Sequence, residues 1–381
     1  AFLKIDLFFF SIDKTWRFAE ITLFSFEITC PQPVLAEFNS GTDLLINIGS
    51  RAPNRLEIDT TDSSETFIIK HTGGAAGDET VEVQWANYKQ TFEHVGRIVV
   101  PDAGQGDDYL DFRGVLSTVE VHGGSGNDTI FLGDGKDSKA FGDDGNDTIT
   151  ASSNTDVTGV EIHGGAGNDI LVAGPTAIKI WGDAGNDTIT GSPEADELYG
   201  DDGTGTSPDG DDTIDAGDGN DLVRGGLGND TIEGGPGNDW IRGDGGNDIV
   251  RGSRGDDILE GGTGDDKLYG SSGNDLLLGG GGSDWANGHG GIDLLIGDDD
   301  PANPVTINSL PITQTNLDAI RTAIAAIPTN GITVRNIPGD TSTAIGNDIL
   351  IGGGNIDGLF GGPGDDFLYG GNFLNNGETE P

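Results

Sequence analysis

Residues 225–242 read GGLGNDTIEGGPGNDWIR, which is two copies of a nine-residue unit that recurs ten times without interruption between Ser207 and Ile296. In every unit the fourth residue is glycine, the sixth is aspartate and the eighth is apolar. Glycine permits the backbone geometry of a tight turn, and the apolar residue provides one inward anchor per unit. Because stacked units cover one another's anchors and build a thin continuous core, the repeat predicts an all-β solenoid.

Stacking would also align the sixth-position aspartates in a row along the turns. A row of bare carboxylates repels itself, so a cation is needed between them. Calcium takes about six to eight oxygen ligands, and these turns offer carboxylates together with glycine carbonyls. Zinc prefers His and Cys, which number five and one in this chain, and magnesium tends to keep its water. The pattern therefore predicts several bound Ca²⁺ ions.

The unit Gly-Gly-x-Gly-x-Asp-x-apolar-x resembles the nonapeptide of the repeats-in-toxin (RTX) family, and residues 225–233 and 234–242 carry the match in full. The resemblance implies a right-handed parallel β-roll in which two nonapeptides make one turn. It also implies that calcium lies between successive glycine-rich turns, held by the aspartate and by backbone carbonyls from roughly the first four positions of the unit.

The candidate calcium ligands are the sixth-position aspartates of regular and looser copies. Asp137 and Asp196 lie in degraded copies and are weaker candidates. Between about 103 and 206 the good copies alternate with strands that lack the motif, so we expect calcium loops on one side of this section and irregular loops on the other. The candidates are Asp108, Asp128, Asp147, Asp169, Asp187, Asp212, Asp221, Asp230, Asp239, Asp248, Asp257, Asp266, Asp275, Asp284, Asp293, Asp348, Asp357 and Asp366.

Composition changes along the chain predict six segments. They are an aromatic β-rich segment (1–38), a metal-poor β-solenoid or small β-domain (39–102), an irregular calcium β-roll (103–206), a regular β-roll (207–296), an insertion (297–345) and final β-roll repeats (346–381).

Two of these segments leave alternatives open. Residues 1–38 hold eight of the 16 Phe and read as a cap on the end of the solenoid or as an interface with another subunit or domain. In the insertion, Leu317, Ile320, Ile324 and Ile327 share one helical face until Pro328. That helix is expected to pack on the side of the roll, and a binding excursion is the alternative.

The formal net charge of −46 limits both the folding behaviour and the partners of the chain. We expect the metal-free chain to be expanded, so that metal binding and folding become one event. The charge argues against nucleic acid and against adsorption to anionic membranes. No run of about 18 uncharged apolar residues predicts a transmembrane helix. The lone Cys30 allows no internal disulfide.

The sequence carries no familiar catalytic motif, since neither a His-Glu-x-x-His pair nor a Gly-x-Ser-x-Gly elbow occurs. His122, His163 and Trp181 each end a strand just before a glycine loop, which predicts stacking between turns rather than catalysis. We therefore expect a protein that is not an enzyme.

The function favoured by the repeats is a secreted, calcium-stiffened structural module of a bacterial surface layer, adhesin or filament, with self-assembly or a cell-surface partner. The alternative is the calcium-dependent repeat region of a secreted enzyme or toxin whose active domain lies outside these residues. The RTX resemblance implies type I secretion, in which the chain would leave the cell unfolded and fold in external calcium.

Overall fold

The computed structural model describes residues 33–39, 41–49, 51–52, 64–202 and 210–298, together with the short pieces 306–307, 310–311, 314–325, 334–335, 349–351, 358–360 and 367–369. The sequence predictions for residues 1–32 lie outside them.

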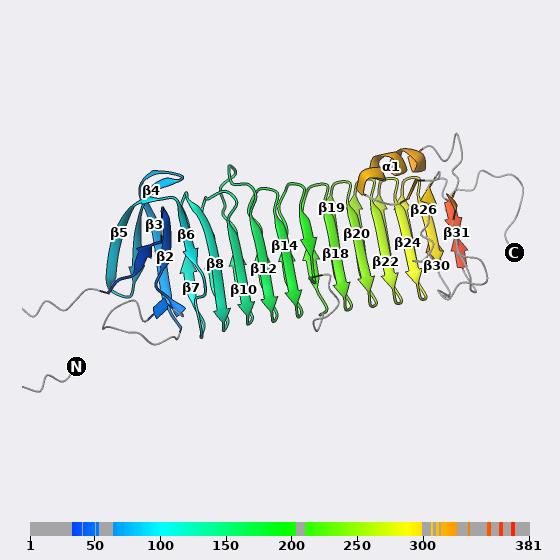
Figure 1. Cartoon of the computed structure of the whole chain (residues 1–381). Coiled ribbons are helices and arrows are strands. Elements are labelled where there is room, and N and C mark those ends of the chain that lie inside the picture. Colours follow the sequence, from blue (N-terminus) through cyan, green and yellow to red (C-terminus); the bar gives the residue numbers. More distant parts are fainter. Residues whose placement is uncertain are drawn as a thin grey trace, which may run out of the picture. The chain divides into compact units, whose positions relative to one another are not determined.

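The described strands form two long sheets, and in each sheet the strands follow one another along the length of the roll (Figure 1). The first sheet has the order β1 (Ala36–Phe38), β2 (Asp43–Ile46), β6 (Arg97–Val100), β8 (Thr118–Ser125), β10 (Lys139–Asp144), β12 (Glu161–Ala166), β14 (Lys179–Ala184), β16 (Glu197–Tyr199), β18 (Leu222–Leu227), β20 (Trp240–Gly245), β22 (Ile258–Thr263), β24 (Leu276–Gly281), β26 (Leu294–Asp298) and β31 (Gly358–Phe360).

The second sheet contains the three strands between β2 and β6 in the sequence and the strands that alternate with those of the first sheet from β6 onward. Its order is β32 (Phe367–Tyr369), β30 (Ile349–Ile351), β25 (Trp285–Gly290), β23 (Lys267–Ser272), β21 (Ile249–Arg254), β19 (Thr231–Pro236), β17 (Thr213–Asp215), β15 (Thr188–Thr190), β13 (Ile170–Val172), β11 (Thr148–Thr150), β9 (Thr129–Phe131), β7 (Tyr109–Asp111), β3 (Thr66–Ala75), β4 (Asp78–Trp85) and β5 (Tyr88–Val95).

Each coil of the solenoid contributes one strand to each sheet. In the regular run β20 pairs in parallel with β22, and Ile241 lies opposite Leu259, two nonapeptides further along the chain. The structure therefore confirms a parallel β-roll, of about 11 turns, with two nonapeptides per turn in the regular run.

The core is the stack of eighth-position side chains between the two sheets. Val223, Ile232, Ile241, Val250 and Leu259 are all 0% exposed and belong to one continuous hydrophobic cluster. The cluster extends from Leu35 to Leu295, so one apolar residue per unit is enough to give the roll a continuous interior.

The N-terminal end of the described roll differs from the rest, because β3, β4 and β5 form an antiparallel meander. β3 also pairs in parallel with β7, and β2 pairs in parallel with β6, so the strands before residue 102 are hydrogen-bonded to the roll through both sheets.

The insertion between β26 and β30 includes a small antiparallel sheet, β28 (Leu310–Pro311), β27 (Thr306–Ile307) and β29 (Val334–Arg335), and a helical segment. The 3-10 turn η2 (Gln314–Asn316) leads into α1 (Leu317–Ala325), where the apolar spacing placed a helix. Ile320 and Ile324 are fully buried in a second apolar cluster with residues of β22, β24 and β26, so α1 packs on the outer face of the first sheet (Figure 1).

An aromatic stack runs along the outer face of the first sheet from β8 to β16. The rings of His122, Phe141, His163, Trp181 and Tyr199 follow one another at centroid distances of 4.3, 5.0, 4.4 and 5.5 Å and lie nearly parallel. The prediction that His122, His163 and Trp181 stack between turns is confirmed.

Candidate metal centre

The predicted aspartate ligands lie in two rows along the roll. Column 1 lies where the chain passes from the first sheet to the second, and column 2 lies where it returns. Every member is at most 3% exposed. Column 1 contains Asp108, Asp128, Asp147, Asp169, Asp187, Asp212, Asp230, Asp248, Asp266 and Asp284, and column 2 contains Asp196, Asp221, Asp239, Asp257, Asp275 and Asp293.

Local sequence places each aspartate at the end of its turn. In the unit that starts at Gly243, Gly246 has φ +132° and Ile249 begins strand β21. The fourth-position glycine thus supplies a left-handed backbone that L side chains rarely adopt, and the chain re-enters a sheet one residue after the aspartate. The sixth position is therefore fixed at the same point of every turn.

The first carboxylate oxygen is held by the main chain of the neighbouring coil. The N–H of Asp230 donates to Oδ1 of Asp248 at 2.8 Å, and the N–H of Asp239 donates to Oδ1 of Asp257 at 2.9 Å. The same bond recurs along both columns, at 2.7–3.0 Å. This bond fixes the orientation of each carboxylate.

In twelve of these aspartates the second carboxylate oxygen is buried and accepts no hydrogen bond. A buried polar atom without a partner costs about 1–3 kcal/mol, and the cost is greater for a charged group, so a regular series of such atoms fits a series of cation sites. The atoms are Oδ2 of Asp128, Asp147, Asp169, Asp187, Asp212, Asp221, Asp230, Asp239, Asp248, Asp257, Asp266 and Asp275.

In ten of these twelve aspartates, all except Asp212 and Asp221, Oδ2 borders the first glycine of its own unit, and we call the space beside that glycine a cradle. A Cβ placed on Gly243 would lie 2.1 Å from Oδ2 of Asp248 and 2.6 Å from the carbonyl oxygen of Gly261, which belongs to the next coil. The same pair of oxygens meets a Cβ on Gly142, where Asp147 and Gly164 contribute them. Carboxylate and main-chain oxygens from successive coils therefore converge where only glycine leaves room.

Burial changes the proton affinity of these carboxylates. It raises the pKa of Asp248 to about 7, of Asp212 to about 8 and of Asp275 to about 9. The backbone hydrogen bond opposes this increase, and neighbouring aspartates add to it. A buried carboxylate in these columns thus demands either a proton or a metal ion.

The available donors suit a hard cation. Across the described part of the chain, no group of three or more His, Cys, Asp or Glu side chains is placed to hold a metal ion. Main-chain carbonyls would therefore have to complete the coordination around the carboxylate oxygens. An all-oxygen set fits Ca²⁺ and lacks the nitrogen and sulfur ligands that zinc prefers.

Column 2 lacks aspartates between β8 and β14, as the irregular spacing of that section predicted. In these coils the place of the aspartate is taken by Ser138, Val160 and Ile178. The hydroxyl of Ser138 accepts a hydrogen bond from the N–H of Val119. The carbonyls of Val160 and Ile178 accept hydrogen bonds from the N–H groups of Lys179 and Glu197 in the next coil. Val160 and Ile178 are buried, at 4% and 5% exposure.

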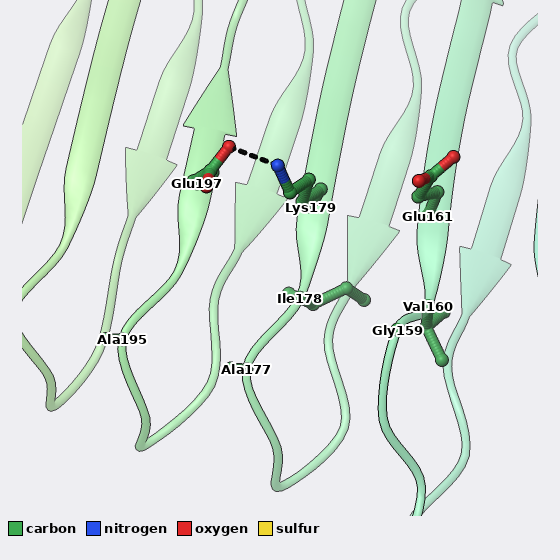
Figure 2. A pocket seen from close by; sticks show the side chains of 8 residues that line it. All are labelled: Gly159, Val160, Glu161, Ala177, Ile178, Lys179, Ala195 and Glu197. Atoms are coloured by element: carbon green, nitrogen blue, oxygen red, sulfur yellow. Dashed lines mark hydrogen bonds and ion pairs between the residues drawn. The ribbon is translucent and has the colours of Figure 1, made fainter. Parts of the chain in front are cut away.

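A pocket of about 200 Å³ opens at this edge of the roll (Figure 2). Val160 and Ile178 lie in its lining, while Glu161, Lys179 and Glu197 come from the adjoining strands. Lys179 Nζ donates to Glu197 Oε2 at 2.6 Å. Apolar packing and surface ion pairs thus replace the carboxylate cradles in this stretch of column 2.

The two weaker candidates have different surroundings. Asp196 stands in column 2, but Ser192 donates its N–H to Oδ2 at 2.6 Å and its hydroxyl to Oδ1 at 2.9 Å. Asp137 is exposed and has φ +54°. Asp348, Asp357 and Asp366 lie outside the described residues, although the strands that follow them, β30, β31 and β32, extend the two sheets.

Glu65, which the sequence pattern did not single out, stands at the head of column 1. Its N–H donates to Oδ1 of Asp108 at 2.6 Å, and its carbonyl accepts from Tyr109 at 2.8 Å. The signal was the order Ser64-Glu65-Thr66-Phe67, which repeats the polar, acidic, Thr, apolar order of residues 229–232. Glu65 went unnoticed because its segment has no glycine turn in front of it.

The fold and its oxygen-lined turns are those of a calcium-binding repeat protein. The family model for the RTX calcium-binding nonapeptide repeat (4 copies) matches residues 120–138, 139–157, 161–175, 179–206, 209–232, 224–259, 260–295 and 343–373, together just over half of the chain. The chain therefore belongs to this family. A search of curated proteins found no match.

Proposed function

We propose that the aspartates of columns 1 and 2, apart from Asp196, bind Ca²⁺ between successive coils, together with Asp348, Asp357 and Asp366. The carrying observation is the regular series of buried Oδ2 atoms that accept no hydrogen bond. At Asp248, for example, Oδ1 stays bound to the N–H of Asp230 in the preceding coil while Oδ2 and the carbonyl of Gly261 in the next coil face the ion. Bound calcium supplies the positive charge that lets these carboxylates stay ionised while buried.

Calcium binding and folding are one process in this proposal. The cradles are assembled from two coils, so an unfolded chain offers no site, and a chain of net charge −46 resists compaction until cations arrive. Calcium then stabilises the folded state by mass action, because it binds that state alone. Such a chain can be exported in an extended form and can fold outside the cell.

The folded chain acts as a secreted structural module in a bacterial surface layer, adhesin or filament, and not as an enzyme. RTX repeats typify secreted proteins. Within the described residues, no helix has the length and apolar character needed to span a bilayer. With neighbouring strands about 4.8 Å apart, about 11 coils give a rod of roughly 50 Å.

A calcium titration of the chelated, purified chain tests this function. Far-UV circular dichroism would follow the β-structure, and small-angle scattering would follow compaction and assembly. We expect a cooperative gain of β-signal with a fall in radius of gyration, and scattering above that of one chain would support assembly. A chelated chain that is already folded, with neither signal responding to calcium, would refute the proposal.

A further inference from the structure

Arg321 is the residue through which the insertion helix α1 reaches the turns of column 2. Its Nε donates to the carbonyl of Asp256 at 2.6 Å. Its Nη2 donates to the carbonyls of Asn238 at 3.0 Å and Asp239 at 3.2 Å. The side chain is only 11% exposed, so the guanidinium is enclosed by these contacts and by α1.

These contacts join two successive coils. Asn238 and Asp256 both occupy the fifth position of their units and lie one coil apart, and their turns are already linked because the N–H of Asp256 donates to Oδ1 of Asn238 at 2.7 Å. The guanidinium adds a second link that carries a positive charge. Its planar array of donors can span two carbonyls in a fixed geometry, which an ammonium group cannot.

The guanidinium and the cradle use different parts of the same turns. Oδ2 of Asp257 faces the first glycine of its unit, where a Cβ on Gly252 would lie 2.2 Å away. Arg321 instead holds carbonyls of the fifth and sixth positions. It therefore leaves the cradle oxygens open to a metal ion.

Apolar contacts fix the position of α1 and therefore the starting point of the Arg321 side chain. Ile320 and Ile324, on either side of Arg321 in the helix, are fully buried against Ile258, Leu276 and Leu294 of the first sheet. The helix backbone is thus fixed before the long arginine side chain is ordered, which lowers the entropic cost of its three hydrogen bonds.

We propose that Arg321 is a positioning residue for cation binding in column 2, because it ties together the turns that carry Asp239 and Asp257. The inference rests on the proposed calcium sites. By linkage, docking of α1 and cation binding at these two turns favour each other. Column 1 provides an internal control, since Arg321 bonds to turns of column 2 and pairs with Asp318 of its own helix.

Terbium luminescence can read the two columns separately, because Tb³⁺ is an oxygen-seeking cation whose emission is sensitised by nearby tryptophan. Trp240 directly follows Asp239 of column 2, and Trp285 directly follows Asp284 of column 1. The emission lost on Trp240→Phe reports column 2, and the emission lost on Trp285→Phe reports column 1. The measured quantity is the terbium concentration at half-saturation for each column in the full chain.

We expect Arg321→Gln to raise the half-saturation concentration of column 2 by about fivefold and to leave column 1 unchanged. Arg251→Gln is the matched control, since it removes the same charge from the surface of the second sheet, and it should leave column 2 as in the wild type. Arg321→Lys should resemble Arg321→Gln, because the charge remains while the bridge between the two turns is lost.

Four results would overturn the inference. They are no effect of Arg321→Gln on column 2, equal shifts in both columns, a shift of column 2 to lower concentration, and full rescue by lysine. Equal shifts would mean that Arg321 only supports the fold, and a shift to lower concentration would mean that it competes with the cation. An absence of terbium emission from both columns of the wild-type chain would instead refute the calcium sites themselves.

Discussion

Two stretches of the roll share one backbone course and differ in how their turns are held. From β8 to β16 only column 1 has a continuous aspartate series, and column 2 is packed with residues such as Val160 and Ile178. From residue 210 to 298 both columns carry aspartate on every coil. The buried eighth-position residues continue through both stretches. The apolar anchors therefore specify the coil, and the aspartates determine how much metal the coil requires.

The largest effect should follow removal of calcium. We expect the two-sided stretch, residues 210–298, to lose its structure at a higher free calcium concentration than the one-sided stretch, residues 118–199, because each coil leaves two buried carboxylates uncompensated instead of one. Hydrogen exchange read by mass spectrometry at graded free calcium would resolve the two stretches. Loss of protection in both at one calcium concentration would show that the roll unfolds as a single unit and would break the comparison.

A large pH effect should appear in the chelated chain. Folding raises the pKa of the loop aspartates from 3.8 to values between about 6 and about 9. A raised pKa in the folded state means that folding takes up protons, so this contribution is fully present below about pH 4 and is lost as the pH rises through about 6 to 9.

In chelator, the β-signal should therefore be greater at pH 5 than at pH 8, and the calcium needed for folding should fall as the pH rises, since protons compete for the same oxygens. Circular dichroism at a series of pH values, with and without calcium, measures both trends. A chelated chain with more β-structure at pH 8 than at pH 5 would contradict the sign of these shifts.

The parts of this architecture that could be read from sequence are those that depend on one residue at one position. The period of nine predicted the eighth-position anchors and the aspartate series, because each rests on a steric or charge requirement that only a few residue types meet. The resemblance to the RTX family implied two nonapeptides per turn, which divides the units into two columns. The spacing of Asp128, Asp147 and Asp169 already indicated that one edge was irregular.

The features that could not be predicted from the sequence depend on contacts between segments that lie far apart in the chain. Arg321 lies 82 residues from Asp239, and nothing in its local pattern indicates that it reaches column 2. Glu65 heads column 1 only because the strand that follows it, β3, pairs with β7 in the second sheet. That Ser192 satisfies both oxygens of Asp196 depends on how the turn closes, and the unit's missing glycine was only an indirect signal.

Removing one aspartate from each column should have the next largest effect. Asp239→Ala with Asp248→Ala deletes one member of each column and also leaves the N–H groups of Asp221 and Asp230 without their acceptors. We expect a loss of about 3–6 kcal/mol from the unfolding free energy in saturating calcium, at roughly 1.5–3 kcal/mol per charged hydrogen-bonding group. Denaturant unfolding at fixed calcium measures it.

The matched control for the aspartates is Asp196→Asn, since Asp196 belongs to column 2 but is bonded to Ser192. It should change the calcium titration little, whereas Asp239→Asn should weaken it. Equal calcium responses from Asp196→Asn and Asp239→Asn would show that the distinction between satisfied and unsatisfied carboxylates has no bearing on metal binding.

A smaller effect should come from filling one cradle. Gly243→Ala places a Cβ 2.1 Å from Oδ2 of Asp248, so the carboxylate must move and the ion between these coils should be lost. We expect about 1–3 kcal/mol of destabilisation from the overpacking and one fewer bound calcium by isothermal titration calorimetry. Gly245→Ala is the control, because its Cβ would first meet the flexible side-chain tip of Leu227 at 2.9 Å. Equal calcium stoichiometry in the two variants would refute the cradle.

The smallest effect should come from the aromatic stack, which tests whether side-chain packing stabilises the one-sided stretch. His163 lies between Phe141 and Trp181 at 5.0 and 4.4 Å, in the stretch where column 2 has no aspartate. Ring pairs contribute about 0.5–1.5 kcal/mol each, so His163→Ala should cost about 1–3 kcal/mol by denaturant unfolding. Because the stack packs on the outer face of the first sheet and contains no calcium ligand, the cost should be the same at high and at limiting calcium. A cost that disappeared at high calcium would mean that metal binding, and not the aromatic stack, holds these coils together.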